Sequence, residues 1–444
     1  MPQLQAQQKA RELSADLYRV SAVVIVVTGH WLLAAVTLRD GRFGYDEVLV
    51  ALPWTQWLTW LFQVVPVFFV VGGYANAASW THWYDIGGGA ARDWLRHRVV
   101  GILGPTTAYV VAVLAVAAVI GAIVRPDTLL AMPMWVVALH LWFVPVYLAV
   151  VALTPIAVAA QRRWGLRVPF GLAAAVAIVD VISIHGPLTG IRPANYALCW
   201  AAIYQLGIAW YAGGFRRYRA ALLATAAAVV LAAVITLGLY PVSMIGVPGQ
   251  PIQNTSPPTV ALLALAGLQA GILIAAAPAV TGWLRRARWR HLLTVANENS
   301  LALYLWHMFP VVAVALVGYP SGLLPQPDIG TARWWWWRLG WVAILAVAAA
   351  GELALLWRAR SVFARNLPTL EVRMPRSWSV PLLAVGAVMS AFALWRFAGH
   401  GFAPGGRFPV ASAVLFTAGV LMSALHPSGG LARRGRDNSM GGDR

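Results

Sequence analysis

Long apolar runs separated by short charged segments dominate the 444-residue chain. A helix that crosses a bilayer needs roughly 20 mostly apolar residues, and twelve stretches approach or exceed that length. The composition, 60% hydrophobic and 11% charged, excludes the soluble classes of protein. We therefore predict an all-α, polytopic integral membrane protein with about twelve transmembrane helices. The predicted spans are 18–38, 56–79, 99–124, 134–158, 168–184, 194–213, 220–240, 259–283, 298–318, 335–357, 379–397 and 408–426.

The positive charges predict how these helices are oriented. If the N-terminus is cytoplasmic, 25 of the 33 basic residues fall in inner segments and 8 in outer ones. Cytoplasmic loops of membrane proteins carry an excess of Lys and Arg, so the alternation predicts a cytoplasmic N-terminus and a cytoplasmic C-terminus. It also accounts for the net charge of +18 without a nucleic-acid partner. Membrane lipids are the expected surroundings.

The rest of the composition narrows the chemistry. A single cysteine, Cys199, excludes an internal disulfide and a cysteine-rich metal site, and we expect no metal cofactor. Arg, Ala and Val in place of Lys and Ile are typical of a high-GC bacterial genome, so we expect a bacterial cytoplasmic (inner) membrane. The tryptophans at 334–337 favour an aromatic belt at the outer interface, with a ligand platform as the alternative.

Ionisable groups inside a predicted span are expensive, so each is a functional candidate. In the first span, Arg19 and His30 are eleven residues apart, which places them on one helix face, with His30 about 16 Å deeper. Asp16 lies within reach of an ion pair with Arg19. The alternative is structural: Arg19 would be a positive-inside anchor and His30 an interhelical hydrogen-bonding residue.

Other helices carry further polar groups. Ser300, Tyr304 and His307 follow the i, i+4, i+7 spacing of one helical stripe, which fits a hydrogen-bond ladder or a lined cavity equally well. His140 with Trp142, and Tyr74 beside a glycine pair, point to the same depth. A shared depth favours a cavity over a purely packed bundle.

Two loops add candidates. Arg96 and Arg98 precede the third span; they are topogenic charges or a fork for the phosphates of a nucleotide-bearing cofactor. The outer segment 240–259 contains five prolines and Asn254. This composition favours a rigid lid with hydrogen-bonding side chains over a floppy linker.

Four segments in order resemble the membrane acyltransferase 3 family. They are Asp16-Leu-Tyr-Arg19-Val-Ser-Ala22 leading to His30, Val67-Phe-Phe-Val-Val-Gly-Gly-Tyr74, His140-Leu-Trp-Phe143, and Asn299-Ser300-Leu-Ala-Leu-Tyr304-Leu-Trp-His307. The resemblance implies transfer of an acyl group, most often acetyl, from cytoplasmic acyl-CoA to a hydroxyl of a glycan, glycolipid or small molecule. It also implies His30 as the catalytic histidine and Arg19 as its essential partner.

The chain departs from the family pattern in two places. The family has two arginines three positions apart at the head of the third helix, whereas here Arg96 and Arg98 are two apart; we assign them to acyl-CoA binding on the resemblance. Two helices also follow the ten-helix core. The predicted organisation is a cytoplasmic segment 1–17, an acyltransferase core 18–357, a cytoplasmic loop with two further helices 358–426, and a disordered cytoplasmic tail 427–444.

These residues suit acyl transfer because an alcohol needs a base beside it and a donor group near the developing oxyanion. Histidine 30 would accept the hydroxyl proton or be transiently acylated, two routes that the sequence does not separate. Tyr304 and His307 are secondary candidates for oxyanion stabilisation or acceptor binding. The alternative is a twelve-helix secondary transporter of a small solute that uses the same embedded His and Arg.

Overall fold

The computed structural model describes residues 12–123, 131–285 and 287–427. Eighteen α-helices account for most of them, and the four strands are short. The helices are α1 (Leu13–Leu33), α2 (Val48–Ala51), α3 (Thr59–Phe62), α4 (Val65–Trp80), α5 (Ala91–Ile123), α6 (Ala131–Val136), α7 (Phe143–Ala152), α8 (Thr154–Trp164), α9 (Arg167–Asp180), α10 (Ala194–Tyr211), α11 (Arg217–Thr236), α12 (Val260–Leu284), α13 (Ala287–Trp306), α14 (Phe309–Gly318), α15 (Ala332–Arg358), α16 (Arg360–Phe363), α17 (Ser379–His400) and α18 (Val410–Ala424). The strands are β1 (Val36–Arg39), β2 (Arg42–Tyr45), β3 (Leu370–Val372) and β4 (Leu425–Pro427).

The helices confirm an all-α membrane protein but not the number twelve. In the described residues, nine helices are long and apolar enough to cross a membrane, and the bent pair α13–α14 makes a tenth. Helices also occupy the two other predicted segments, α10 and α18, but α18 has only 15 residues. Helix α10 is packed by α4, α9 and α12, and because it faces protein, it tolerates polar residues such as Asn195 and Gln205. The tail after Pro427 and the first eleven residues lie outside the described residues.

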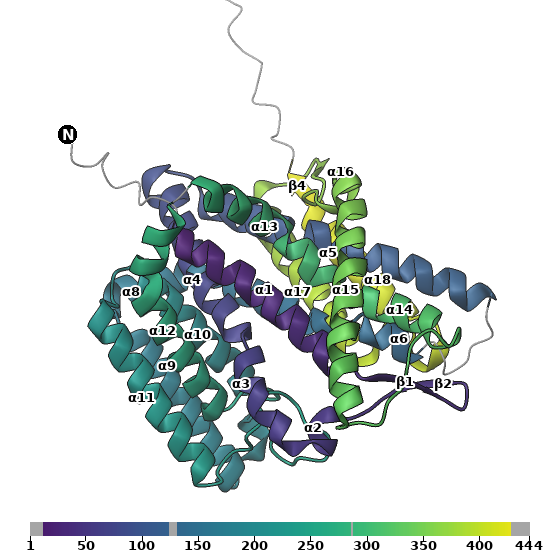
Figure 1. Ribbon diagram of the computed structural model, residues 1–444. Coiled ribbons are helices and arrows are strands. Elements are labelled where there is room, and N and C mark those ends of the chain that lie inside the picture. The colour runs from purple at the N-terminus through teal and green to yellow at the C-terminus, as the bar shows by residue number, and fades with distance from the viewer. Residues whose placement is uncertain (1–11, 124–130, 286, 428–444) are drawn as a thin grey trace, which may run out of the picture.

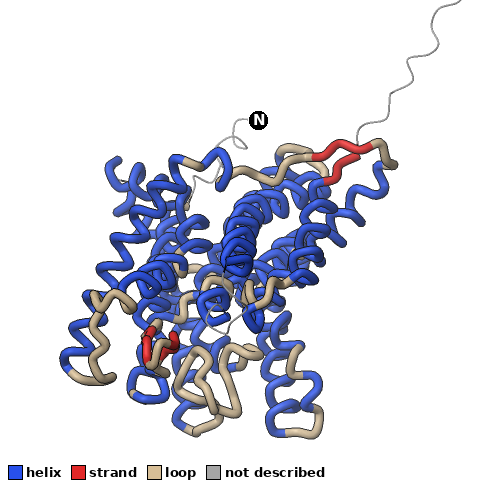
Figure 2. The backbone as a smooth tube through the Cα atoms, turned by 90° about the vertical axis from the view of Figure 1, so that its right-hand side faces the viewer, coloured by secondary structure: helices blue, strands red, loops and turns tan. Residues whose placement is uncertain are grey.

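Helix α1 runs through the middle of the molecule, as Figure 1 shows, and packs against α4, α12, α13 and α15. The first described residues and strand β4 lie at one end of the helical body, which we call the terminal face. The antiparallel hairpin β1–β2 and helix α2 lie at the other end, the hairpin face. Figure 2 shows the longer loops collected near the hairpin face. If the predicted topology holds, the hairpin face is the outer one.

Glycines allow the closest helix crossing beside α1, which is the contact between α4 and α10. The glycine pair before Tyr74 in the sequence suggests such an approach. A Cβ on Gly73 of α4 would lie 2.1 Å from the Tyr204 carbonyl oxygen of α10, and one on Gly207 would lie 1.8 Å from the Val70 carbonyl oxygen. Only glycine permits backbones to approach this closely. The crossing holds α4 and its aromatic residues against α10.

Side-chain hydrogen bonds hold the loop 237–259 in a fixed conformation at the hairpin face. The buried Asn254 donates to the carbonyls of Pro241 (2.8 Å) and Ser243 (2.9 Å) and accepts from Thr259 (2.7 Å). At one end of the loop, Tyr240 donates to the buried Asp180 at 2.9 Å. Burial and the Asp180 carboxylate raise the pKa of Tyr240, so its hydroxyl remains a donor. This dense pinning agrees with the predicted rigid lid.

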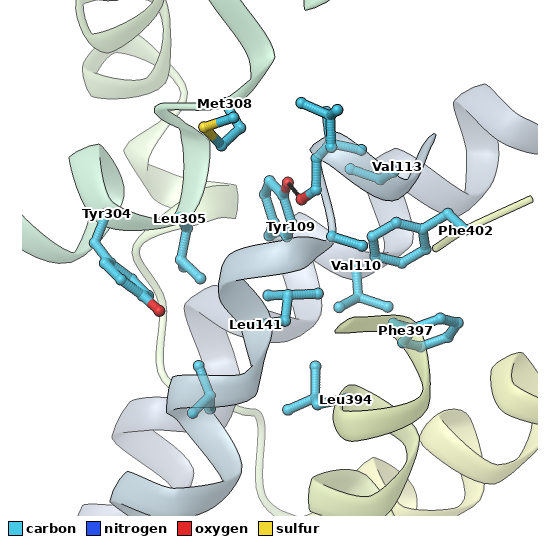
Figure 3. Packing of buried hydrophobic residues seen from close by; sticks show 14 of the residues in the cluster. Tyr109, Val110, Val113, Leu141, Tyr304, Leu305, Met308, Leu394, Phe397 and Phe402 are labelled. Carbon is cyan, nitrogen blue, oxygen red and sulfur yellow. Dashed lines mark hydrogen bonds between the residues drawn. The ribbon is translucent and has the colours of Figure 1, made fainter. Parts of the chain in front are cut away.

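The two C-terminal helices pack into the same hydrophobic core as the rest of the chain. Figure 3 shows Leu394, Phe397 and Phe402 beside Tyr109 and Leu141. Helix α17 packs against α7 and the 3₁₀ turn Leu139–Trp142, and the linker strand β3 pairs in parallel with β4. The α17–α18 hairpin is therefore an integral wall of the bundle.

Candidate active site

A cavity of about 740 Å³ opens at the hairpin face and ends at the histidines predicted from the sequence. Its lining includes His30, His140 and Tyr304 deep in the bundle, together with Trp142 and the guanidinium of Arg338. Loop segments at 45–50 and 245–256 border it at the hairpin face. Its size and largely aromatic and aliphatic lining with a few polar groups are those of a small-molecule site.

His30 and His307 form a directly hydrogen-bonded pair within this region. The Nδ1 of His30 lies 2.8 Å from the Nε2 of His307, and the rings are stacked with centroids 5.0 Å apart. The Nδ1 of His307 lies 2.7 Å from the Tyr304 carbonyl oxygen. Because a carbonyl only accepts, His307 carries its proton on Nδ1, and its neutral Nε2 accepts from the Nδ1 of His30. The unprotonated nitrogen of His30 is then Nε2.

The Nε2 of His30 is thus a lone pair on a half-buried ring in the cavity wall. In the described residues, Nε2 has no hydrogen-bond partner, and the ring is held through Nδ1. A neutral imidazole with one nitrogen fixed by a donor contact and the other free is arranged as a base or a nucleophile. Of the polar stripe, Tyr304 lines the cavity, whereas His307 is buried behind it with both ring nitrogens hydrogen-bonded.

A break in the helix presents His307 to His30. Helices α13 and α14 bend by 53° between Trp306 and Phe309, because Pro310 has no N–H for the carbonyl of Trp306. At the break, the His307 carbonyl accepts a hydrogen bond from the indole Nε1 of Trp31 at 2.8 Å. This bond joins the break to the residue that follows His30, so the two histidines are held from both sides.

His140 is the third histidine of the cluster. Its ring is 5.0 Å from that of His307 between centroids, and its carbonyl accepts from the Tyr304 hydroxyl at 2.6 Å. Both of its ring nitrogens are buried without a hydrogen bond of normal geometry, although the backbone of Leu305 lies close to the ring. In the described part of the chain, no group of three or more His, Cys, Asp or Glu side chains is placed to hold a metal ion.

Arg19 and Arg98 lie together nearer the terminal face. Arg19 donates to Asn297 at 3.4 Å, and Asn297 donates to Asp16 at 3.5 Å, so the amide bridges the two residues predicted to form an ion pair. Arg98 interacts electrostatically with Arg19 and lies over Trp94 at 5.6 Å. Its Nε is buried without a partner in the described residues. An arginine with an unused donor, in the field of a second positive charge, is suited to an anion such as phosphate.

Arg96 is not brought to the same place. Its guanidinium donates to the carbonyls of Ser423 (3.2 Å), Ala424 (3.0 Å) and Leu425 (2.9 Å). These are carbonyls at the C-terminus of α18, where a cation is favoured. The geometry therefore gives Arg96 a capping task and favours Arg98 alone for the phosphate-binding role predicted for the pair.

The remaining predicted residues are dispersed around the site. Trp142 lines the cavity, whereas the Ser300 hydroxyl donates to the Asn297 carbonyl beside Arg19 (2.8 Å). Tyr74 packs on Trp210 with ring centroids 4.4 Å apart. Asn254 acts within the loop and is absent from the cavity lining. Of the predicted stripe on α13, Tyr304 therefore lies with the histidines, whereas Ser300 bonds to the backbone of its own helix.

Three polar residues near the site were missed as candidates. Arg338 and Glu352 both fall inside the predicted span 335–357, and an ionisable residue inside a span is itself a functional signal. The charge pattern uses Arg338 only as one of the 8 outer basic residues. The Glu352 Oε1 is buried without a partner in the described residues. Asn297 precedes the predicted ninth span, and no spacing rule connects it to Arg19.

Comparison with known proteins identifies one family. The family described as an acyltransferase domain matches residues 12–353, well over half of the 444-residue chain. No curated protein and no solved structure matches. The match ends within α15, so α16, α17 and α18 lie beyond it.

Proposed function

The chain belongs to the acyltransferase 3 family, and from this premise we propose that it moves an acyl group, most simply acetyl, from cytoplasmic acyl-CoA to a hydroxyl of a cell-envelope glycan, glycolipid or small molecule. The family and the apolar helices make it a multi-pass membrane acyltransferase. The transporter alternative was supported only by a count of twelve helices, which the structure does not confirm.

The observation that carries the proposal is the chain of contacts from the Tyr304 carbonyl through His307 to His30. It leaves the Nε2 of His30 as a lone pair in the cavity. In direct transfer, Nε2 takes the proton from the acceptor hydroxyl while the oxygen attacks the thioester carbonyl. The carbon–sulfur bond breaks, and the leaving thiolate takes the proton from the His30 imidazolium, so His30 returns to its neutral form.

The same nitrogen also serves the two-step route. There, Nε2 attacks the thioester carbonyl, the carbon–sulfur bond breaks, and a thiolate leaves an acyl-imidazolium. The acceptor oxygen then attacks the acyl carbon, the bond to Nε2 breaks, and the hydroxyl proton goes to the thiolate. Because both routes use Nε2, both require His30 Nδ1 to carry the proton that His307 accepts. His307 is then a positioning residue in either case.

We place the donor at the terminal face and the acceptor at the hairpin face. Arg19 and Arg98 would hold the phosphates of acyl-CoA, and the cavity would hold the acceptor. The cavity lining ends before Arg19 and Arg98. The proposal therefore includes a path between α1, α5 and α13 that opens when the donor binds.

The experiment measures thiol release from acetyl-CoA by the full chain in proteoliposomes supplied with envelope extract. His30→Ala is expected to lower the rate by about 10²- to 10⁴-fold, the usual contribution of a positioned base. His82→Ala, an exposed histidine of the same residue type, is the matched control and should retain the wild-type rate. Turnover of His30→Ala at the wild-type rate would falsify the assignment.

A further inference from the structure

The cavity contains one buried charged side chain in the described part of its lining, Arg338 of α15. It is 3% exposed and lies between two indoles, 5.5 Å from the Trp334 ring centroid and 5.7 Å from that of Trp341. Cation–π contacts of this kind retain a cation in an apolar wall. They do not use its N–H groups.

Only part of the hydrogen-bonding capacity of Arg338 is used. Its Nη2 donates to the carbonyls of Trp31 (3.1 Å) and Ala34 (3.0 Å) at the end of α1. Its Nε is buried with no partner in the described residues. A guanidinium has five N–H groups, and a buried donor without a partner destabilises the folded state. A ligand that accepts from the unused N–H groups of Arg338 would remove that penalty.

No carboxylate of the described chain accepts from the unused N–H groups of Arg338. Asp46 and Glu47 also line the cavity, and Asp46 acts electrostatically on Arg338. Asp46, however, accepts from Arg39 at 2.9 Å, and Glu47 is exposed. The ion pairs of the described residues do not include Arg338. The buried charge of the cavity is therefore positive.

We propose that the acceptor is an amphipathic alcohol that carries an anionic group, a carboxylate or a phosphate, and that Arg338 binds this group. The inference rests on the proposed function, because it assigns the cavity to the acceptor. The N–H groups of Arg338 that Trp31 and Ala34 leave unused can donate to either oxyanion, and such bonds from a guanidinium to a carboxylate or phosphate are charge-assisted. The apolar walls receive the rest of the molecule. Arg338 contacts the carbonyls of Trp31 and Ala34, within about a turn of His30 on α1, and both side chains line the same cavity. The ligand would therefore be held and acylated in one cavity.

The test compares two probes that differ only in a carboxylate, hexyl glucuronide and hexyl glucoside. The full-length protein in nanodiscs of neutral lipid is heated with each, and the rise in Tm reports binding. We expect the glucuronide to raise Tm more than the glucoside, and high salt to reduce the difference. Equal shifts from the two probes overturn the proposal.

Matched variants separate this site from other effects. Arg338→Gln should abolish the preference, whereas Arg396→Gln, which removes a nearby arginine outside the lining, should retain it. Since Arg338→Gln also removes the cap on α1 and can fail to fold, Arg338→Lys is the second variant, with an expected loss of about tenfold in affinity for the glucuronide. A preference that survives in Arg338→Gln, or an undiminished affinity for the glucuronide in Arg338→Lys, contradicts the proposal.

His30→Ala distinguishes this inference from the proposed function. It should still prefer the glucuronide to the glucoside, because it leaves Arg338 untouched. Retained binding with lost thiol release supports both. Preference for the glucuronide with undiminished thiol release in His30→Ala would remove the catalytic assignment while leaving the anion site.

Discussion

The central residue-scale feature is a histidine, His30, whose unprotonated nitrogen is defined by a backbone carbonyl two contacts away. The Tyr304 carbonyl fixes the tautomer of His307, and His307 fixes that of His30. Neither step requires a buried carboxylate, so no charge has to be desolvated to orient the base. The arrangement suits a site within a membrane.

Substitutions of His307 test this positioning role. In His307→Gln, the amide oxygen can occupy the place of Nε2 and accept from His30 Nδ1, so we expect kcat to fall by about tenfold. In His307→Leu no acceptor remains, and kcat should fall by roughly 10²-fold or more, with KM for acyl-CoA unchanged. Steady-state rates with acetyl-CoA check both, and equal losses in the two variants argue for a merely packed histidine.

The two arginines at the start of α5 should respond in opposite ways. Arg98→Gln is expected to raise KM for acetyl-CoA about tenfold with little change in Tm, because a charge-assisted bond to phosphate is lost. Arg96→Gln should leave KM unchanged and cost about 2 kcal/mol of stability, because it frees the carbonyls at the end of α18. Acetyl-pantetheine, which lacks the nucleotide, should erase the Arg98 effect. An unchanged KM in Arg98→Gln contradicts the donor site.

At the scale of elements, the α4–α10 crossing is the contact that tolerates least change. Gly73→Ala puts a methyl group 2.1 Å from the Tyr204 carbonyl oxygen, and a backbone atom cannot move aside. We expect a loss of about 2 kcal/mol or more, seen as a lower Tm. Gly171→Ala in α9 meets nothing within 4 Å and should be neutral or slightly stabilising. Similar Tm values for both variants would show that the crossing is loose.

The elements also show what a sequence can predict. Hydrophobic runs located a helix at every predicted segment because span length depends only on local composition. Helical spacing identified His30, Tyr304 and His307 because it, too, depends only on residues close together in the sequence. The 53° bend at His307 was missed, although Pro310 marks it, because a proline in a span is often absorbed. The bonds of Arg96 to α18 span more than 300 residues, and no local pattern encodes them.

The whole molecule separates two kinds of chemistry. The arginine pair lies toward the terminal face, and the histidine cavity opens at the hairpin face, with α1 connecting them. The α17–α18 hairpin lies beyond the family match, yet Trp395 and Ala398 of α17 line the cavity. Since this hairpin shares the core with Tyr109 and Leu141, it forms part of the wall of the cavity that we propose holds the acceptor.

This division requires one orientation in the membrane, which the positive charges predict and cysteine labelling can measure. Cys199 is fully buried, so the wild type should give no background with an impermeant maleimide. Arg42→Cys, on the exposed β1–β2 hairpin, should be labelled in intact cells. Arg217→Cys, exposed at the start of α11, should be labelled only after permeabilisation. The reverse pattern would put the arginine pair outside, where there is no acyl-CoA, and would exclude the donor site proposed for Arg19 and Arg98.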